Sequence, residues 1–380
     1  MAEKVDIIGA GIGGLTTAIT LAQKGLAVTL YEGAAEFKPV GAGIVIASNA
    51  MQVFKKMGIH KKIEPLGCRI SAMKITDATL KCISTIDLRE YERKYEVHNL
   101  AMLRSDLQAI LANEIGLDKI KLSKRLQCIE KTAHYKLTFE DRTTLASRML
   151  IGADGIKSVV RSQLFSQGTL RTANQICWRG VCDVDLPKKY DNEINEAWGR
   201  GRRFGFVKLP GGKVYWFALI NAREVTDPNF DLADSFKTFH DDVLVLIKAT
   251  PVEKINVADI IDLKPIDKWQ DEGACLIGDA AHGSTPNLGQ GACQAIEDAY
   301  TLGLLVESGL PLQAAFKQFE KIRIRKAHAI THMSWKIGQL AHIDNRLGIW
   351  LRNGIMKRMP KMIQKKQTDM IFDLDGQFAK

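Results

Sequence analysis

Several features that would assign this chain to other classes of protein are missing from its sequence. No apolar run approaches the roughly 18 residues that a membrane-spanning helix needs, and there is neither an internal repeat nor a low-complexity tract. Histidines and cysteines do not occur at the spacing of a zinc site, so no metal is expected. The seven cysteines are irregularly spaced, which fits a reducing compartment better than a disulfide framework. Since the first residues lead directly into an apolar strand, we expect no signal peptide and a cytoplasmic protein.

A further shortage concerns acidic residues. They number 43 against 53 basic ones, which leaves a net charge of +10. No nucleic-acid reader motif accompanies this excess, so nucleic-acid binding is not expected. What remains is a chain of 380 residues, 46% hydrophobic and 25% charged, which is typical of a globular protein with two domains.

What the sequence does contain is three glycine-punctuated segments, far apart in the chain. The first, GAGIGG, follows a short apolar strand and opens a helix. Gly9, Gly11 and Gly14 let the main chain turn tightly and approach a pyrophosphate at the helix N-terminus. Glu32 ends the next strand, 18 residues after Gly14, close to the about 20 expected of an acid that accepts from ribose hydroxyls. This segment predicts a dinucleotide site but does not separate NAD from FAD.

The second segment lies in the middle of the chain. Residues 149–153 are typical of a buried strand, which leads to Asp154 and a glycine. Arg161 follows shortly afterwards, and we expect it to connect loops through carboxylates rather than to bind a ligand.

The third segment is the most informative one. Residues 274–277 predict a strand that delivers Asp279 at its carboxyl end, where ligands of open α/β sheets bind. Beyond it come Pro286, Gly289, Gln290 and Gly291, followed by a helix with an apolar side. Such a helix N-terminus can place N–H donors against the negative charge of a reduced flavin. His282 is expected to be structural rather than a catalytic base. Together the three segments predict a flavin site.

In this order the motifs resemble those of the single-component FAD-dependent aromatic hydroxylases, the group A flavoprotein monooxygenases. The resemblance spans residues 5 to about 300 and rests on GAGIGG with the later glutamate, LRSDL, DGIKSVVR and GDAAH-x3-P-x2-GQG. Residues 41–44 and Asn49 are most similar to the branch of salicylate and urate hydroxylases and zeaxanthin epoxidases. The implied fold is α/β: a Rossmann-like, GR2-type FAD-binding domain with an inserted mixed or antiparallel β-sheet domain for substrate, and C-terminal helices.

The resemblance also implies roles for individual residues. Glu32, Arg104 and Asp279 are expected to bind FAD, residues 289–291 to face the isoalloxazine ring, and Asp154 to serve a motif linked to FAD and pyridine nucleotide.

Arg104 has some independent support. Ser105 and Gln108 form a capping-box pattern, which places Arg104 at a helix start, where anions are stabilised. The alternative is a surface arginine without a ligand.

The implied activity is that of an NAD(P)H-consuming monooxygenase. NADH or NADPH reduces FAD, O2 adds at C4a, and the hydroperoxyflavin transfers one oxygen to an electron-rich aromatic or polyene-type small molecule. No second complete GxGxxG fingerprint is present, so the pyridine nucleotide is expected to bind only transiently. NADH versus NADPH, and hydroxylation versus epoxidation, stay open. The alternatives are a flavin oxidoreductase of the reductase or halogenase type and a non-catalytic FAD-binding regulatory protein.

We expect discontinuous domains, because strand-like runs interrupt the βα pattern. The FAD-binding domain is predicted at 1–70, 98–165 and 270–340, the substrate-binding β-sheet domain at 71–97 and 166–269, and a basic helical segment at 341–380. Aromatic residues concentrate in the sheet domain, where the pocket candidates are Arg179, Arg203, Phe206 and Trp216. Alternatively, the aromatics are ordinary core and the arginines are exposed.

Two other features of the sequence have competing interpretations. Cys177 and Cys182 have the spacing of a redox pair, but they lie on a predicted strand, where residues five apart point to opposite faces, so buried thiols are expected. Residues 346–366 are basic, free of acids and interleaved with apolar residues. This segment is either a membrane-surface helix or, as we prefer, a terminal helix that packs its apolar side on the flavin domain and is broken at Pro360.

Overall fold

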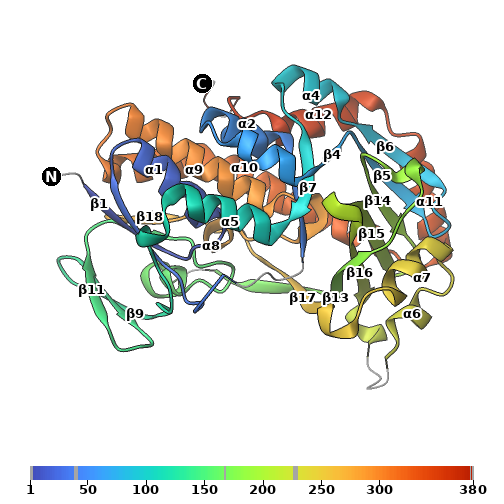
Figure 1. Ribbon diagram of the computed structural model, residues 1–380, viewed down its shortest axis with the longest axis horizontal. Coiled ribbons are helices and arrows are strands. Elements are labelled where there is room, and N and C mark those ends of the chain that lie inside the picture. The colour runs from blue at the N-terminus through green and yellow to red at the C-terminus, as the bar shows by residue number, and fades with distance from the viewer. Residues whose placement is uncertain (1–2, 38–41, 167, 226–229, 377, 379–380) are drawn as a thin grey trace.

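The computed structural model describes residues 3–37, 42–166, 168–225, 230–376 and 378 (Figure 1). Within these residues one sheet has six strands, in the order β18-β19-β12-β1-β2-β8. Neighbouring strands are parallel except β18 and β19. The strands are β1 (Lys4–Ile8), β2 (Ala27–Tyr31), β8 (Ile120–Lys121), β12 (Leu150–Gly152), β18 (Gln270–Asp271) and β19 (Ala274–Leu276). This sheet confirms the predicted α/β class.

The register of the six-stranded sheet brings the carboxyl ends of its central strands together. Ile8 pairs with Tyr31 on one side and with Gly152 on the other, and Gly152 pairs with Leu276. The three glycine-punctuated segments and Glu32 therefore leave the sheet at the same edge, where ligands of such sheets bind.

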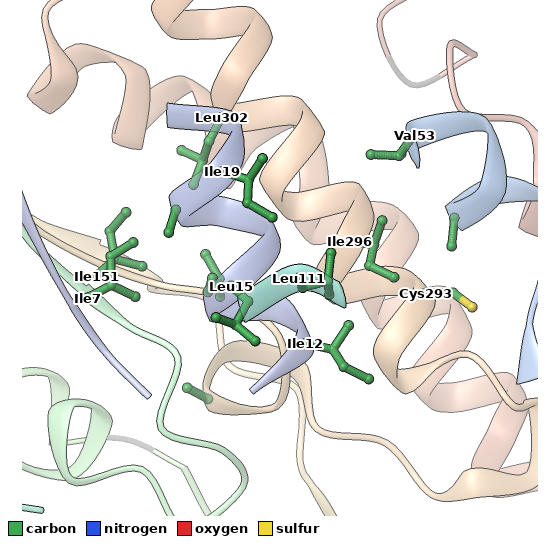
Figure 2. Packing of buried hydrophobic residues seen from close by; sticks show 14 of the residues in the cluster. Ile7, Ile12, Leu15, Ile19, Val53, Leu111, Ile151, Cys293, Ile296 and Leu302 are labelled. Carbon is green, nitrogen blue, oxygen red and sulfur yellow. The ribbon is translucent and has the colours of Figure 1, made fainter. Parts of the chain in front are cut away.

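Helices pack in layers beside this sheet. α1 (Ile12–Gln23) contacts β1 and β2, and α10 (Leu312–Ala341) contacts β18 and β19. α5 (Arg104–Ile115) and α9 (Gly291–Glu307) pack on α1, and α2 (Ser48–Lys56) packs on α9. Figure 2 shows Ile19 of α1 and Leu302 of α9 in one buried cluster with Ile7 of β1. Each such buried aliphatic side chain contributes about 1.5–3 kcal/mol to stability. The two helices approach closely because Gly303 of α9 faces Thr20 of α1, where a Cβ would collide.

The second large sheet has seven strands in the described residues, in the order β17-β13-β16-β15-β14-β5-β6. Neighbours are antiparallel except β14 and β5, so the sheet is mixed, as predicted. The strands are β5 (Ala72–Asp77), β6 (Cys82–Asp87), β13 (Leu170–Asp183), β14 (Glu193–Trp198), β15 (Arg202–Lys208), β16 (Lys213–Asn221) and β17 (Asn256–Leu263). The exact domain boundaries stay a prediction.

The described residues also form two three-stranded sheets and several short helices. One sheet contains β3 (Gly43–Ile46), β4 (Cys68–Ile70) and β7 (Asn99–Leu103), and the other contains β9 (Leu126–Lys131), β10 (Tyr135–Phe139) and β11 (Thr144–Ser147). The short helices are α3 (His60–Ile63), α4 (Arg89–Tyr95), α6 (Leu232–Ser235), α7 (Asp241–Lys248) and α8 (Asp279–His282).

Side-chain alternation gives the seven-stranded sheet two different faces. The aromatic face is buried against residues of α7 and carries Trp178, Phe204, Phe206 and Trp216. The opposite face, called here the polar face, carries Arg179, Arg203, Tyr215 and Phe217, as the strand pairing requires. The expected separation of the two cysteines on β13 is confirmed: Cys182 lies with the aromatic face, Cys177 lies with Leu219 on the other, and both thiols are free.

The C-terminal segment forms α11 (Arg346–Lys357) and α12 (Lys361–Phe372), with Pro360 between them. We expected its apolar side chains to pack on the flavin domain, and for α11 this is wrong. Leu347 and Trp350 are 74% and 71% exposed, because α11 turns Arg352 and Met356 inward instead. None of the helices described is both long and apolar enough to cross a membrane.

Candidate cofactor and substrate site

The glycine turn after β1 is closely packed at two positions and open at a third. Gly9 has a φ of +101°, and a Cβ there would collide with the carbonyl oxygen of Ala153 in the second segment. A Cβ at Gly14 would collide with the carbonyl oxygen of Gly9, whereas one at Gly11 would meet no atom within 4 Å. Gly11 precedes α1, whose first turn has neither a side-chain cap nor an acid. Its N–H groups and positive dipole end are therefore available to an anion such as a pyrophosphate.

Two side chains hold this turn in place. The Glu32 carboxylate accepts hydrogen bonds from the backbone N–H groups of Ala10 at 2.8 Å and Ala34 at 2.9 Å. Gln108 of α5 donates from Nε2 to the carbonyl oxygen of Ala10 at 3.0 Å. Glu32 lies beside the turn, as its spacing requires, but sequence reasoning missed this role of Gln108. The available signal was its position one helical turn after Arg104, which puts both residues on one face.

The start of α5 differs from the predicted capping box. The helix begins at Arg104, directly after β7, and Leu103 is an N-cap without a side-chain hydrogen bond. Ser105 Oγ lies 3.4 Å from Asp106 Oδ1, and Gln108 is engaged at the glycine turn. The predicted capping box is wrong. With Ser105 as the N-cap the helix would begin at residue 106, but it begins two residues earlier because β7 passes directly into it.

Arg104 and Asp279 come from different segments, and the structure places them near each other. Both side chains are exposed, and among the described residues neither makes a side-chain hydrogen bond or ion pair. Surrounding protein atoms nevertheless desolvate both groups: burial lowers the pKa of Arg104, which Asp279 opposes. Burial likewise raises the pKa of Asp279, which His282 and Arg104 oppose. Two opposite charges without hydrogen-bonding partners suit a ligand that carries both donors and acceptors.

Asp154 of the second segment is engaged locally. One carboxylate oxygen accepts from Ser158 Oγ at 2.5 Å, and the other accepts from the N–H groups of Val159 at 2.7 Å and Val160 at 3.1 Å. Burial raises the pKa of Asp154 and these hydrogen bonds oppose the rise. The carboxylate thus fixes the bend between β12 and the following turn.

Arg161 connects the second and third segments, but not through carboxylates as expected. Its guanidinium donates to the carbonyl oxygens of Ala280 at 2.9 Å and Ile156 at 2.6 Å. Backbone carbonyls replace the carboxylates because the two segments meet here through their main chains.

The start of α9 offers a second open helix N-terminus. Gly289 has a φ of +62°, and a Cβ there would meet no atom within 4 Å. A Cβ at Gly291 would lie 3.7 Å from Asp279 Oδ1. Gln290 is buried and accepts from Asn49 Nδ2 at 3.0 Å, which connects α9 to α2. Since the first turn of α9 has no side-chain cap and no acid, its N–H groups are available to a ligand, and Gly291 places them beside Asp279.

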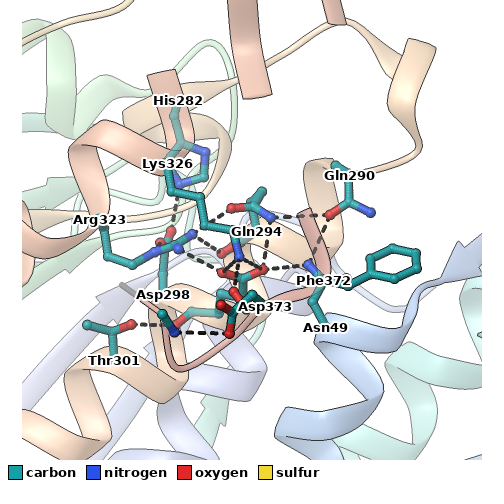
Figure 3. Close-up of polar contacts among 12 residues, drawn as sticks. Asn49, His282, Gln290, Gln294, Asp298, Thr301, Arg323, Lys326, Phe372 and Asp373 are labelled. Atoms are coloured by element: carbon teal, nitrogen blue, oxygen red, sulfur yellow. Dashed lines mark hydrogen bonds and ion pairs between the residues drawn. The ribbon is translucent and has the colours of Figure 1, made fainter. Parts of the chain in front are cut away.

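Behind α9 lies a buried charge network (Figure 3). Arg323 of α10 donates to Glu297 at 2.8 Å and to Asp298 at 2.7 Å. The other oxygen of Asp298 lies 2.7 Å from His282 Nε2 and accepts from Gly278 N at 2.8 Å. Burial alone raises the pKa of Asp298, but His282 and Arg323 lower it to about 2. Sequence reasoning missed Arg323, because nothing in the sequence pairs it with acids on another helix.

The polar face of the seven-stranded sheet meets the third segment at Arg203. This arginine is buried and donates to Glu196 Oε1 at 3.0 Å and to Asn287 Oδ1 at 2.5 Å. Asn287 belongs to the turn just before the start of α9. Nearby, burial raises the pKa of Tyr215, and the positive charge of Arg179 opposes this rise. Arg179 also adds to the lowering of the pKa of Arg104. Arg179 therefore contributes positive charge near the site, whereas the charge of Arg203 is paired with Glu196.

The other two pocket candidates lie elsewhere. Phe206 packs edge-on against Tyr190, with 5.0 Å between ring centroids, and Trp216 donates from Nε1 to Thr250 at 2.8 Å. Both belong to the aromatic face, away from Arg203 and Asn287. For these two residues the placement favours ordinary core.

Comparison with known proteins gives the family of the chain. The chain matches the FAD binding domain family over residues 2–330. It is 34% identical to the aurachin C monooxygenase/isomerase of Stigmatella aurantiaca, covering 93% of this chain and 94% of that protein. It is 28% identical to the 2-heptyl-3-hydroxy-4(1H)-quinolone synthase of Pseudomonas aeruginosa, covering 99% of both.

Solved structures show the same fold. That of Klebsiella pneumoniae HpxO in complex with FAD and uric acid has a TM-score of 0.88 at 24% identity, covering 97% of this chain and 96% of that one. A salicylate hydroxylase in complex with its substrate has a TM-score of 0.79 at 19% identity, covering 99% and 97%. These matches confirm the predicted fold, and the family model with the sequence relatives confirms the resemblance and FAD as the cofactor. The chain belongs to the FAD binding domain family and, within it, to the FAD-dependent monooxygenases.

Proposed function

We propose that this flavin monooxygenase consumes NADH or NADPH and transfers one oxygen atom from O2 to an electron-rich aromatic small molecule. The observation that carries the proposal is a convergence. Two open helix N-termini and the Arg104–Asp279 pair meet the polar face of the seven-stranded sheet in one place.

Each of these parts fits a portion of FAD. Gly11 and the start of α1 are proposed to bind the pyrophosphate, and Glu32 to accept from ribose hydroxyls. Arg104 and Asp279 are proposed to supply a cation and a hydrogen-bond acceptor for the part of FAD between the pyrophosphate and the flavin ring. The start of α9 supplies N–H donors for the flavin ring. FAD supplies the redox and oxygen-transfer chemistry when bound, and the chain supplies binding, orientation and exclusion of water.

The polar face is proposed to hold the substrate. Tyr215 lies against Gly43 and Phe217 against Gly205, at positions where a Cβ would collide with the ring. The two rings are therefore held in place. Arg179 adds positive charge beside them, while Arg203, paired with Glu196, connects this face to Asn287. A flat ring that carries a carbonyl or an ionised oxygen fits this combination.

A 4-quinolone is the first substrate candidate. The name of one relative, similar over 99% of this chain, describes the synthesis of a 3-hydroxy-4(1H)-quinolone with a heptyl chain. The same quinolone without the 3-hydroxyl group is a flat ring with a carbonyl, which fits the polar face. Urate and salicylate, bound or acted on by other proteins of the same fold, provide the comparison rings.

The test is substrate-stimulated oxidation by the FAD-loaded protein. NADH and NADPH consumption and O2 uptake are measured with a 2-alkyl-4(1H)-quinolone, with urate, with salicylate and without substrate. We expect the quinolone to raise both rates together and to yield a product heavier by one oxygen atom.

Two outcomes would contradict the proposal. A product that forms equally well without O2 would indicate a reductase. Nucleotide oxidation that no aromatic compound stimulates, without any oxygenated product, would indicate a binding or regulatory flavoprotein.

A further inference from the structure

We propose that α11 and the start of α12 bind the surface of an anionic lipid bilayer. The inference is independent of the proposed function, because it rests on the surface of the C-terminal helices. The contact surface, called here the C-terminal apolar patch, consists of Leu347, Trp350, Leu351 and Ile355 of α11 with Met362 and Ile363 of α12.

The exposure of this patch is unusual for its residue types. Trp350 is 71% exposed and Met362 is 79% exposed, and the other members are also exposed. Single exposed apolar residues are common, but a group of them along one stretch marks an interaction site. The four members on α11 follow one another at spacings of three, one and four residues, which places them on one face of the helix.

The orientation of α11 shows that this exposure is built in. Its inward residues are Arg352 and Met356, which lie one helical turn apart. The Arg352 guanidinium donates to the carbonyl oxygen of Ala341 at 3.0 Å and lies over the ring of Trp198, 5.3 Å from its centroid. A buried arginine thus attaches α11 to the protein, beside β6 in Figure 1. The apolar side chains of the opposite face are exposed.

The charges around the patch select an anionic surface. From residue 346 to 368 the sequence has seven Lys or Arg and no Asp or Glu. Six of these basic side chains are exposed: Arg346, Lys357, Arg358, Lys361, Lys365 and Lys366. Within the described residues, Lys365 alone among the six has an acidic partner, Glu90. Apolar side chains flanked by unpaired cations match the interface of a bilayer that contains anionic lipids.

A second copy of this chain fits the same surface poorly. In a symmetric dimer the patch would face itself, since a two-fold interface joins identical surfaces. The unpaired cations of both copies would then face one another without acids between them, which like-charge repulsion opposes. A membrane with negative headgroups neutralises these charges while it buries the apolar residues.

The proposal is tested by sedimentation of the full-length, FAD-loaded protein with vesicles. Vesicles of phosphatidylcholine alone are compared with vesicles that also contain phosphatidylglycerol. We expect the protein to pellet with the anionic vesicles, to stay in solution with the neutral ones, and to be released at high salt.

Variants assign the binding to the patch. The double variant Leu347→Ser, Trp350→Ser should lose sedimentation with anionic vesicles, and Lys361→Glu with Lys366→Glu should lose it as well. The matched control is Val252→Ser, since Val252 is an apolar residue that is 82% exposed and lies outside α11 and α12, so this variant should leave sedimentation unchanged. All five substituted sites are exposed, and circular dichroism with flavin absorbance verifies that each variant is folded.

Several results would overturn the proposal. These are equal sedimentation with neutral and anionic vesicles, no sedimentation with either, or undiminished binding of the patch variants. Light scattering adds an independent check: a wild-type dimer that becomes monomeric in the apolar variant, without vesicle binding, would show that the patch joins two copies of the chain.

Discussion

The six-stranded and seven-stranded sheets form their two sides of the site in different ways. Around the six-stranded sheet the backbone is decisive: Gly9 and Gly14 exclude side chains from the turn, while Gly11 leaves space for a ligand. Around the seven-stranded sheet side chains are decisive, and their direction depends on strand register. Arg203 points to Asn287 near α9, whereas Trp216 on the adjacent strand points the other way. The glycine turn is therefore determined by residues that are close together in the sequence. The pocket wall on the sheet depends instead on how distant strands pair.

The largest effect is expected from a variant that disrupts the buried charge network behind α9, on the side of the site formed by the six-stranded sheet. Arg323→Ala removes the cation that Glu297 and Asp298 share, so that Glu297 keeps Lys326 and Asp298 keeps His282. Breaking a buried pair in this way costs about 3–5 kcal/mol. We expect the free energy of unfolding, measured with urea, to fall by that amount and FAD retention to fall with it, because the network holds the start of α9.

The matched control for this variant is Arg325→Ala, two residues further along α10 and exposed. It should change the free energy of unfolding by less than about 0.5 kcal/mol. Equal stability of the two variants would show that the network does not hold α9, and the six-stranded side would then depend on its glycine turns alone.

The same contrast explains how far the sequence could predict the molecule. Glu32 and Asp279 each follow the end of a strand closely in the sequence. Local patterns were therefore sufficient to predict that both acids lie at the edge of the sheet where ligands bind. Gln108 and Arg323 act on segments far away in sequence, and no local pattern reports such contacts. Phe206 was assigned to the pocket for a related reason: composition locates aromatics on a sheet but not on which face they lie.

The next prediction tests the open position of the glycine turn. Gly11 has an ordinary φ of −70° and free space around its Cβ position, so Gly11→Val should fold normally. The valine would occupy the space proposed for the pyrophosphate. We expect FAD affinity to fall by at least about 100-fold, or about 2.7 kcal/mol, as measured by flavin absorbance after gel filtration and by titration.

Asp279→Ala is the companion variant, because it removes the proposed acceptor without adding bulk. It should also purify with depleted FAD, while Gly354→Ala on α11 should purify with full flavin absorbance. Full flavin content in both Gly11→Val and Asp279→Ala would contradict the assignment of this edge as the cofactor site.

The smallest expected effects come from one variant on each face of the seven-stranded sheet, compared by kcat/KM and by stability. Arg203→Met removes the charge and the hydrogen bonds to Glu196 and Asn287 while keeping the length of the side chain. We expect kcat/KM for the aromatic substrate to fall about 10–100-fold, that is by about 1.4–2.7 kcal/mol, mainly through KM and with FAD retained. Trp216→Phe loses the hydrogen bond to Thr250 and should lower stability by about 1–2 kcal/mol with kcat/KM unchanged. Both variants are measured well below their unfolding temperatures and at equal flavin content. If Trp216→Phe lowered kcat/KM as much as Arg203→Met, the two faces would not be distinct, and the pocket could not be assigned to the polar face from strand register.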